Sequence, residues 1–136
     1  MSDYFVRPAM MADWPILAQI TKDCDLDVPG LSYDVFTGMV IVAEHSEDGV
    51  IGFVQCLPGA PTSVVTDMAV LPGHRKQGVA HLLGVALEYT LKGLGYSSWV
   101  CYVRGNRGDG WRDSLKKWGT LESKVKGYFH RRIIPA

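Results

Sequence analysis

The first half of the chain has the hydrophobic pattern of four strands and one helix. Short apolar runs bounded by turn-forming residues are typical of strands, and they occupy residues 4–7, 35–44, 50–57 and 63–71. After the first run, apolar residues recur at helical spacing from Met11 to about Cys24, which predicts a helix. Residues 23–32 contain Pro29, Gly30 and alternating acids, so we expect a loop there.

The second half begins with the clearest helical pattern of the chain. Apolar residues recur every three or four positions from Gly78 to about Lys92, and Gly93 and Gly95 mark the end of this helix. The other elements predicted here are a strand over 98–103, a short helix over 111–118 and a final strand or hairpin arm over 124–134. The order β-α-β-β-β-α-β-α-β predicts one α/β (α+β) domain over residues 1–136, a central mixed sheet flanked by helices.

The junction between the strand at 63–71 and the helix from Gly78 carries the most specific chemical pattern. A basic loop enters the helix at a glycine, and a helix N-terminus offers unpaired N–H groups and a partial positive charge to phosphate. The Walker spacing is absent, because Lys76 precedes Gly78 and no hydroxyl follows. Gly73 and Gly78 do not give the dinucleotide spacing G-x-G-x-x-G either.

The remaining pattern is Arg75-x-x-Gly78-x-Ala80 after a strand that ends in Ala69-Val70-x-Pro72. It resembles the acyl-CoA-binding motif of the GNAT superfamily of N-acyltransferases. The order of elements also resembles the GNAT fold over nearly the whole chain, which implies a mostly antiparallel sheet. The resemblance implies acetyl-CoA as cofactor, coenzyme A as product, and contacts from Met68, Ala69, Val70, Arg75, Lys76, Gln77, Gly78, Val79, Ala80 and Asn106.

In proteins similar to this one, the strand before the loop diverges from its neighbour at a bulge. The resemblance therefore assigns the backbone of Met68 and Val70 to the acetyl carbonyl and the pantetheine arm. A protonated amine acceptor must also lose a proton before it attacks. Asp67, on the same strand, and Glu44, at the end of a neighbouring strand, are the two candidate bases.

The general acid that the family commonly uses is missing from this sequence. Aligned from Asn106 or from Gly119, the position of the usual tyrosine falls on Asp113 or Leu115. Water can protonate the departing thiolate instead, and the alternatives are the hydroxyls of Tyr102 and Tyr128.

Charge is balanced over the chain but unevenly distributed. Lys and Arg number 14, as do Asp and Glu, so the net charge of zero argues against a general nucleic-acid binder. Residues 1–50 are acidic and residues 104–136 are basic. The acids Asp23, Asp25 and Asp27 lie in a segment that walls the acceptor site in similar proteins, where they would attract a cationic amine. A solvated acidic loop is the alternative.

Cysteine and histidine placement suggests neither metal nor secretion. Cys24, Cys56 and Cys101 are widely spaced, and we expect free thiols in a cytoplasmic protein without signal peptide or membrane span. We expect no metal. His74 and His81 flank the cofactor loop, where His74 is expected in solvent near phosphate.

These patterns favour an N-acetyltransferase that transfers acetyl from acetyl-CoA to a primary amine, of a small molecule or a protein, by direct transfer in a ternary complex. The alternative is a catalytically weak or inactive GNAT-like module that binds acyl-CoA and regulates a partner. A third hypothesis, an acyltransferase directed to nucleic acid by the basic C-terminal face, is disfavoured. A homodimer through the C-terminal strands is left open.

Overall fold

The computed structural model describes residues 3–26, 28, 30–37, 39–57, 63–103, 121–124 and 128–135. The strands in this part of the chain are β1 (Tyr4–Pro8), β2 (Val40–His45), β3 (Gly49–Leu57), β4 (Ser63–Val70), β5 (Ser98–Val103), β6 (Leu121–Lys124) and β7 (Tyr128–Ile133). The helices are η1 (Met11–Asp13), α1 (Trp14–Asp23), α2 (Leu31–Thr37), η2 (Pro72–His74) and α3 (Val79–Gly93).

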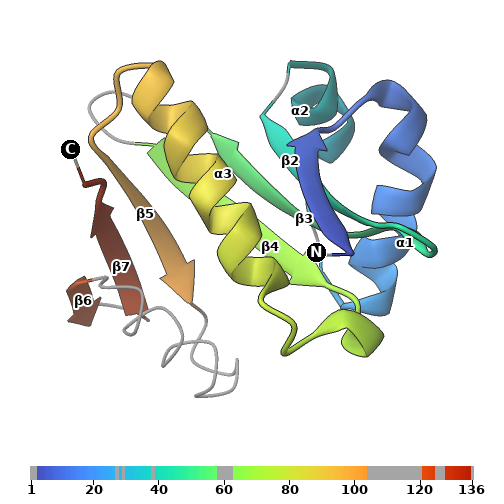
Figure 1. The fold of residues 1–136 in the computed structure, drawn as a ribbon. Coiled ribbons are helices and arrows are strands. Elements are labelled where there is room, and N and C mark those ends of the chain that lie inside the picture. The colour runs from blue at the N-terminus through green and yellow to red at the C-terminus, as the bar shows by residue number, and fades with distance from the viewer. Residues whose placement is uncertain are drawn as a thin grey trace.

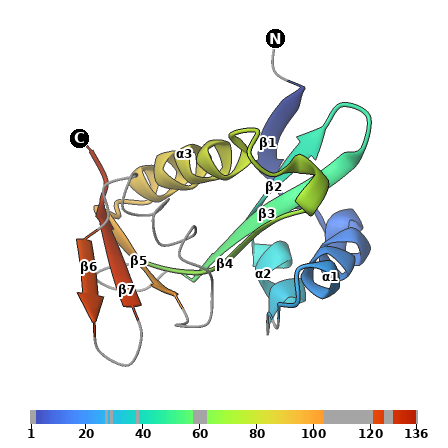
Figure 2. The ribbon, with the colours of Figure 1, turned by 90° about the horizontal axis from the view of Figure 1, so that it is seen from below.

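The described strands form one mixed sheet in the order β1-β2-β3-β4-β5-β7-β6. β4 and β5 pair in parallel, and the other neighbours pair antiparallel. The parallel pair requires a crossover connection, which α3 provides. Figure 2 shows α3 on one face of the sheet and α1 with α2 on the other. This arrangement confirms the predicted fold class. None of the helices in the described residues is long and apolar enough to cross a membrane.

The strands contribute alternate side chains to two hydrophobic cores, one on each face of the sheet. On one face, the buried stripe of α3 packs against the sheet through Val79, Leu83, Leu87 and Leu91. On the other face, buried residues of α1 and α2 pack against β2, β3 and β4; they include Leu17, Ile20, Leu31, Val35, Val42, Phe53 and Ala69. The sheet is therefore covered on both faces along β2, β3 and the second half of β4.

The predicted loop over 23–32 and strand over 35–44 are wrong where they overlap α2. Leu31, Asp34 and Val35 are buried at helical spacing, and the Asp34 N–H donates to the Gly30 carbonyl at 2.9 Å. A helix of seven residues presents too short a pattern to compete with the apolar run that begins at Val40. Packing against the sheet, rather than local periodicity, makes this segment helical.

At the C-terminal end, the predicted final arm is two strands, β6 and β7, which pair antiparallel. The predicted helix over 111–118 lies outside the described residues. Figure 1 shows β6 and β7 completing the sheet beyond β5, at the opposite side from β1.

Candidate functional site

β4 leaves β5 halfway along its length. The parallel pairing covers only the start of β4, from Ser63 opposite Trp99 to Val65 opposite Cys101. On its other side β4 stays paired with β3 as far as Val70. Figure 2 shows the two strands diverging beyond their short contact. The structure therefore shows the divergence that the family resemblance implied, and among the described strands only β3 pairs with the second half of β4.

A bulge coincides with this divergence. Gln55 pairs with Asp67 and Cys56 pairs with Val65, so Thr66 is an extra residue on β4. The Thr66 hydroxyl donates either to the Gln55 side-chain oxygen at 3.0 Å or to the Gln55 backbone oxygen at 3.3 Å. These contacts hold the bulge against β3.

The register beyond the bulge decides which backbone groups face the gap. The Leu71 N–H donates to the Ile51 carbonyl at 2.9 Å, so this is a hydrogen-bonded pair. Hydrogen-bonded and non-hydrogen-bonded pairs alternate along antiparallel strands. Val70 and Met68 are therefore non-hydrogen-bonded residues with respect to β3, and their N–H and C=O groups point toward the side that β5 has left.

The loop from η2 to α3 presents the start of a helix beside this open edge. Gly78 is the N-cap of α3 with φ of 82°, a left-handed conformation that glycine adopts without a steric penalty. The first N–H groups of α3 lack the intrahelical partner that later residues have, and no side chain in the described part of the chain caps them. Lys76 also has a positive φ, of 61°, and the side chains of Arg75, Lys76 and Gln77 are exposed.

Arg75 does more than add charge to this loop. Its Nε donates to the Val70 carbonyl at 2.8 Å, and its terminal nitrogen lies 3.8 Å from the Cys24 sulfur. The guanidinium thus joins the loop to the end of β4 and to the end of α1. The carbonyl of Val70 is therefore bonded to Arg75, and the N–H of Val70 still points toward the gap.

Two carboxylates lie on the face of the sheet that α1 and α2 cover. Asp67 is on the same face of β4 as the buried Ala69, two residues further on. Asp34 of α2 is 5% exposed and accepts a hydrogen bond from the side-chain amide of Gln55, which is 2% exposed. The chain Asp34, Gln55, Thr66 therefore runs from α2 through β3 to the bulge.

The sequence patterns did not indicate Asp34 or Gln55 as site residues. A glutamine inside the apolar run of β3 was the available signal, because a buried amide needs a partner. Asp34 could not be assigned as that partner while its segment was predicted to be a strand or loop.

Glu44, the second candidate base, lies away from Asp67. On β3, Glu44 pairs with Val50, whereas Met68 pairs with Val54 four residues along that strand. Its carboxylate accepts a hydrogen bond from the Arg7 guanidinium at 3.0 Å. That ion pair is a structural role for Glu44, and catalysis by Glu44 stays a prediction.

Arg7 binds a second carboxylate in the same place. Its two terminal nitrogens donate to the oxygens of Asp13 at 2.8 and 3.0 Å, and Asp13 also accepts from the Met10 N–H at 2.8 Å. The hydrogen bonds from Arg7 are the largest cause that lowers the pKa of Asp13. The hydrogen bond from the Met10 N–H lowers it further, whereas burial acts to raise it. The bidentate ion pair between Arg7 and Asp13 therefore holds η1 against β1.

The structure describes the remaining predicted site residues only in part. Asn106, Asp27, Asp113 and Leu115 lie outside the described residues, and of Tyr102 and Tyr128 only the strand positions are described. Asp23 accepts from the Gln19 amide at 2.9 Å, and Asp25 is exposed. His81 is exposed on α3, whereas the expectation that His74 lies in solvent is wrong, because its side chain is 14% exposed.

Comparison with known proteins identifies the family of the chain. A family model described as the acetyltransferase (GNAT) domain matches residues 37–112, more than half of the chain. The protein belongs to the GNAT family, whose members include acetyltransferases. A sequence search of curated proteins finds no match.

Solved structures share the fold at low sequence identity. The PaiA N-acetyltransferase of Thermoplasma acidophilum, in complex with coenzyme A, is 13% identical with a TM-score of 0.81, covering 98% of this chain and 99% of that chain. Ard1 of Thermoplasma volcanium is 17% identical with a TM-score of 0.83 over 99% and 100%. Diaminobutyrate acetyltransferase EctA of Paenibacillus lautus, with L-2,4-diaminobutyric acid and coenzyme A, is 16% identical with a TM-score of 0.78 over 98% and 96%.

Proposed function

We propose that the protein is an N-acetyltransferase that transfers acetyl from acetyl-CoA to a cationic primary amine. The observation that carries this proposal is the open edge of β4, where the backbone of Met68 and Val70 faces the gap left by β5. The uncapped start of α3 adds a phosphate-binding end to the same edge. An edge that offers amides to an extended arm, next to amides for a pyrophosphate, fits the pantetheine arm and the pyrophosphate of coenzyme A.

In this proposal the loop and the strand bind different parts of the cofactor. The N–H groups from Arg75 to Ala80 hold the pyrophosphate, and Lys76 adds positive charge there. The N–H groups of Met68 and Val70 bind the acetyl carbonyl and the pantetheine arm, and a donor at the carbonyl stabilises the negative charge that develops on its oxygen. Asn106 is proposed to meet the pantetheine arm as well.

The acceptor is proposed to be cationic because the face beside Asp67 is acidic. Among the described residues, no cation pairs with the buried carboxylate of Asp34, which accepts a hydrogen bond from the neutral side-chain amide of Gln55. An ammonium group that approaches the open edge of β4 is attracted by both carboxylates. The EctA structure holds a diamine amino acid, which is consistent with this class of acceptor.

Asp67 is proposed to accept the proton of the ammonium group, directly or through water. Acetyl-CoA supplies an activated thioester, and the C–N bond to the amine forms as the C–S bond breaks. The departing thiolate takes its proton from water or from a tyrosine hydroxyl. A covalent intermediate on the buried cysteines is disfavoured, since burial raises the pKa of Cys56 to about 11 and that of Cys101 to about 12.

A binding assay and a turnover assay together test the proposal. Acetyl-CoA is offered with polyamines, aminoglycosides, peptide N-termini and lysine peptides, and acetylated product is measured by mass. Gly78→Glu introduces bulk, a strained φ and a negative charge at the proposed phosphate position, so acetyl-CoA binding should be lost. Gly93→Glu, at the other end of α3 with nothing within 4 Å of the new Cβ, is the matched control. Equal affinity of Gly78→Glu and Gly93→Glu would contradict the cofactor assignment.

The second candidate function is an acyl-CoA-binding module without turnover. The observation in its favour is the absence of tyrosine at both aligned positions, Asp113 and Leu115. Calorimetric binding of acetyl-CoA with no product from any amine would support the module, and turnover with one amine would remove it. A cytoplasmic location and a homodimer through the C-terminal strands stay predictions.

A further inference from the structure

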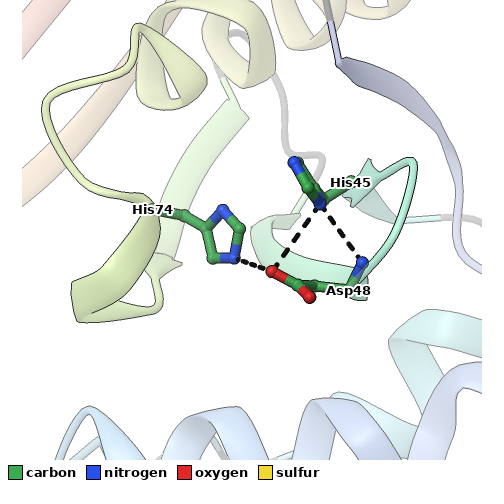
Figure 3. A group of neighbouring side chains, drawn as sticks. All are labelled: His45, Asp48 and His74. Atoms are coloured by element: carbon green, nitrogen blue, oxygen red, sulfur yellow. Dashed lines mark hydrogen bonds and ion pairs between the residues drawn. The ribbon is translucent and has the colours of Figure 1, made fainter.

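Two segments distant in sequence, the β2–β3 hairpin and η2, bring two histidines and an aspartate together at the turn of that hairpin. His45 ends β2, Asp48 lies in the hairpin turn, and His74 ends η2 (Figure 3). His74 Nε2 lies 2.9 Å from Asp48 Oδ2, and His45 Nδ1 lies 3.6 Å from the same oxygen. One nitrogen from each histidine and one aspartate oxygen all lie within 4.8 Å of one another.

These distances suit a small divalent transition metal. Zn²⁺ binds imidazole nitrogen and carboxylate oxygen at about 2.0–2.2 Å in tetrahedral geometry, which separates neighbouring ligand atoms by roughly 3.3–3.5 Å. The two distances from Asp48 Oδ2 lie on either side of that range. Two imidazoles and one carboxylate favour Zn²⁺ over Mg²⁺ or Ca²⁺, because the harder cations prefer oxygen ligands alone.

Tyr4 supplies the support that a metal-binding histidine needs. Its hydroxyl lies 2.8 Å from His74 Nδ1, the ring nitrogen opposite the one that faces Asp48. When His74 Nδ1 carries the proton and donates it to the tyrosine oxygen, Nε2 presents its lone pair to a metal. The Tyr4 and His74 rings are 5.6 Å apart edge-to-face, so the imidazole is oriented by packing as well as by the hydrogen bond.

The cluster is shielded on one side and open on the other. The side chains of His45 and His74 are 16% and 14% exposed, and their ring centroids are 4.9 Å apart. Asp48 is 59% exposed, which leaves room for water as a fourth ligand. His45 Nδ1 accepts long hydrogen bonds from the Glu47 and Asp48 N–H groups, at 3.3 and 3.2 Å, and a metal would replace these weak contacts.

We propose that His45, Asp48 and His74 bind one Zn²⁺ ion, with Tyr4 as the supporting residue. The site is structural: a metal there would clamp η2 to the β2–β3 hairpin, one residue before Arg75 and the loop that leads to α3. This assignment does not depend on the acyl-transfer proposal, since it concerns different residues and a different ligand.

Tag-free protein, freed of metal with a chelator, is titrated with Co²⁺ and with Zn²⁺. We expect one saturable equivalent, visible Co²⁺ bands typical of tetrahedral coordination, their loss on adding Zn²⁺, and a higher Tm with Zn²⁺ but not with Mg²⁺. Asp48→Asn and His74→Asn should each weaken Zn²⁺ affinity at least tenfold, whereas His81→Asn, which changes a histidine outside the cluster, should not.

Asp48→Asn keeps the test independent of folding, because it changes one exposed turn side chain without changing its size. Its metal-free Tm should match that of the wild-type protein. Absence of saturable binding to the wild-type protein, or Zn²⁺ affinity that is the same in Asp48→Asn and His81→Asn, would overturn the proposal.

Discussion

Gly52 permits the close approach of β3 and β4 at the open edge, and Gly52→Ala tests how much the proposed site depends on it. A Cβ built at Gly52 lies 2.7 Å from the Ala69 carbonyl oxygen and 3.4 Å from the Val70 Cα. The atoms in the way belong to backbone, which cannot rotate aside as a side chain can. The two strands must therefore separate locally by several tenths of an ångström.

The expected cost has a stability part and a functional part. Overpacking of this kind destabilises a fold by about 1–3 kcal/mol. Among the described strands only β3 pairs with the second half of β4, so the displacement is passed to Met68 and Val70, whose amides face the gap. A misplacement of about 1 Å costs roughly 100-fold in rate, and a smaller shift should cost roughly tenfold in kcat/KM for acetyl-CoA.

Chemical unfolding and steady-state kinetics measure the two parts separately. Gly93→Ala is the control, because a Cβ at Gly93 meets nothing within 4 Å and the residue lies at the far end of α3. It should leave kcat/KM unchanged. If Gly52→Ala keeps both the free energy of unfolding and the kcat/KM for acetyl-CoA of the wild-type protein, the argument from the close approach fails.

Three further predictions concern ionisable groups. Arg7 holds the pKa of Asp13 below its unfolded value of about 3.9, so Asp13→Asn should reduce the free energy of unfolding by about 1–3 kcal/mol at pH 7. Because that stabilisation is present above the unfolded pKa and lost as pH falls through the folded one, the gap between variant and wild type should close in urea melts below about pH 4; a constant gap would refute the cause. Asp67→Asn should lower kcat by roughly 100-fold or more with unchanged acetyl-CoA affinity, and a kcat equal to that of the wild type at every pH would exclude it as the base. Cys56 and Cys101 should resist alkylation at pH 8 until the protein unfolds, as time-resolved mass spectrometry would show, because burial raises their pKa values; rapid labelling of either in folded protein would contradict this.

The strands of the core were predictable because their patterns are local. The runs Val40–Ala43 and Val50–Val54 are apolar enough to be strands in any arrangement, and the turn at residues 46–49 joins them. The start of α3 was also predictable from a local signal, because Gly78 adopts a left-handed φ that few other residues adopt.

The features missed from the sequence all depend on which segments meet. Seven residues of α2 take their helical form from packing against β2 and β3, so Asp34 could not be paired with Gln55 in advance. His74 is 26 residues from Asp48, and only the pairing of β3 with β4 brings η2 back to the hairpin turn. Spacing along the chain carries no information about such a cluster.

The single extra residue at Thr66 has a consequence for how this protein can vary. Before the bulge, Val65 faces the core beneath α3; after it, Asp67 and Ala69 face α1 and α2. Because Thr66 has no partner on β3, its loss would leave Val65 and Asp67 on their present, opposite faces and would remove only the bulge. The facing of β4 therefore survives a single deletion at Thr66, whereas the bulge beside the proposed site does not.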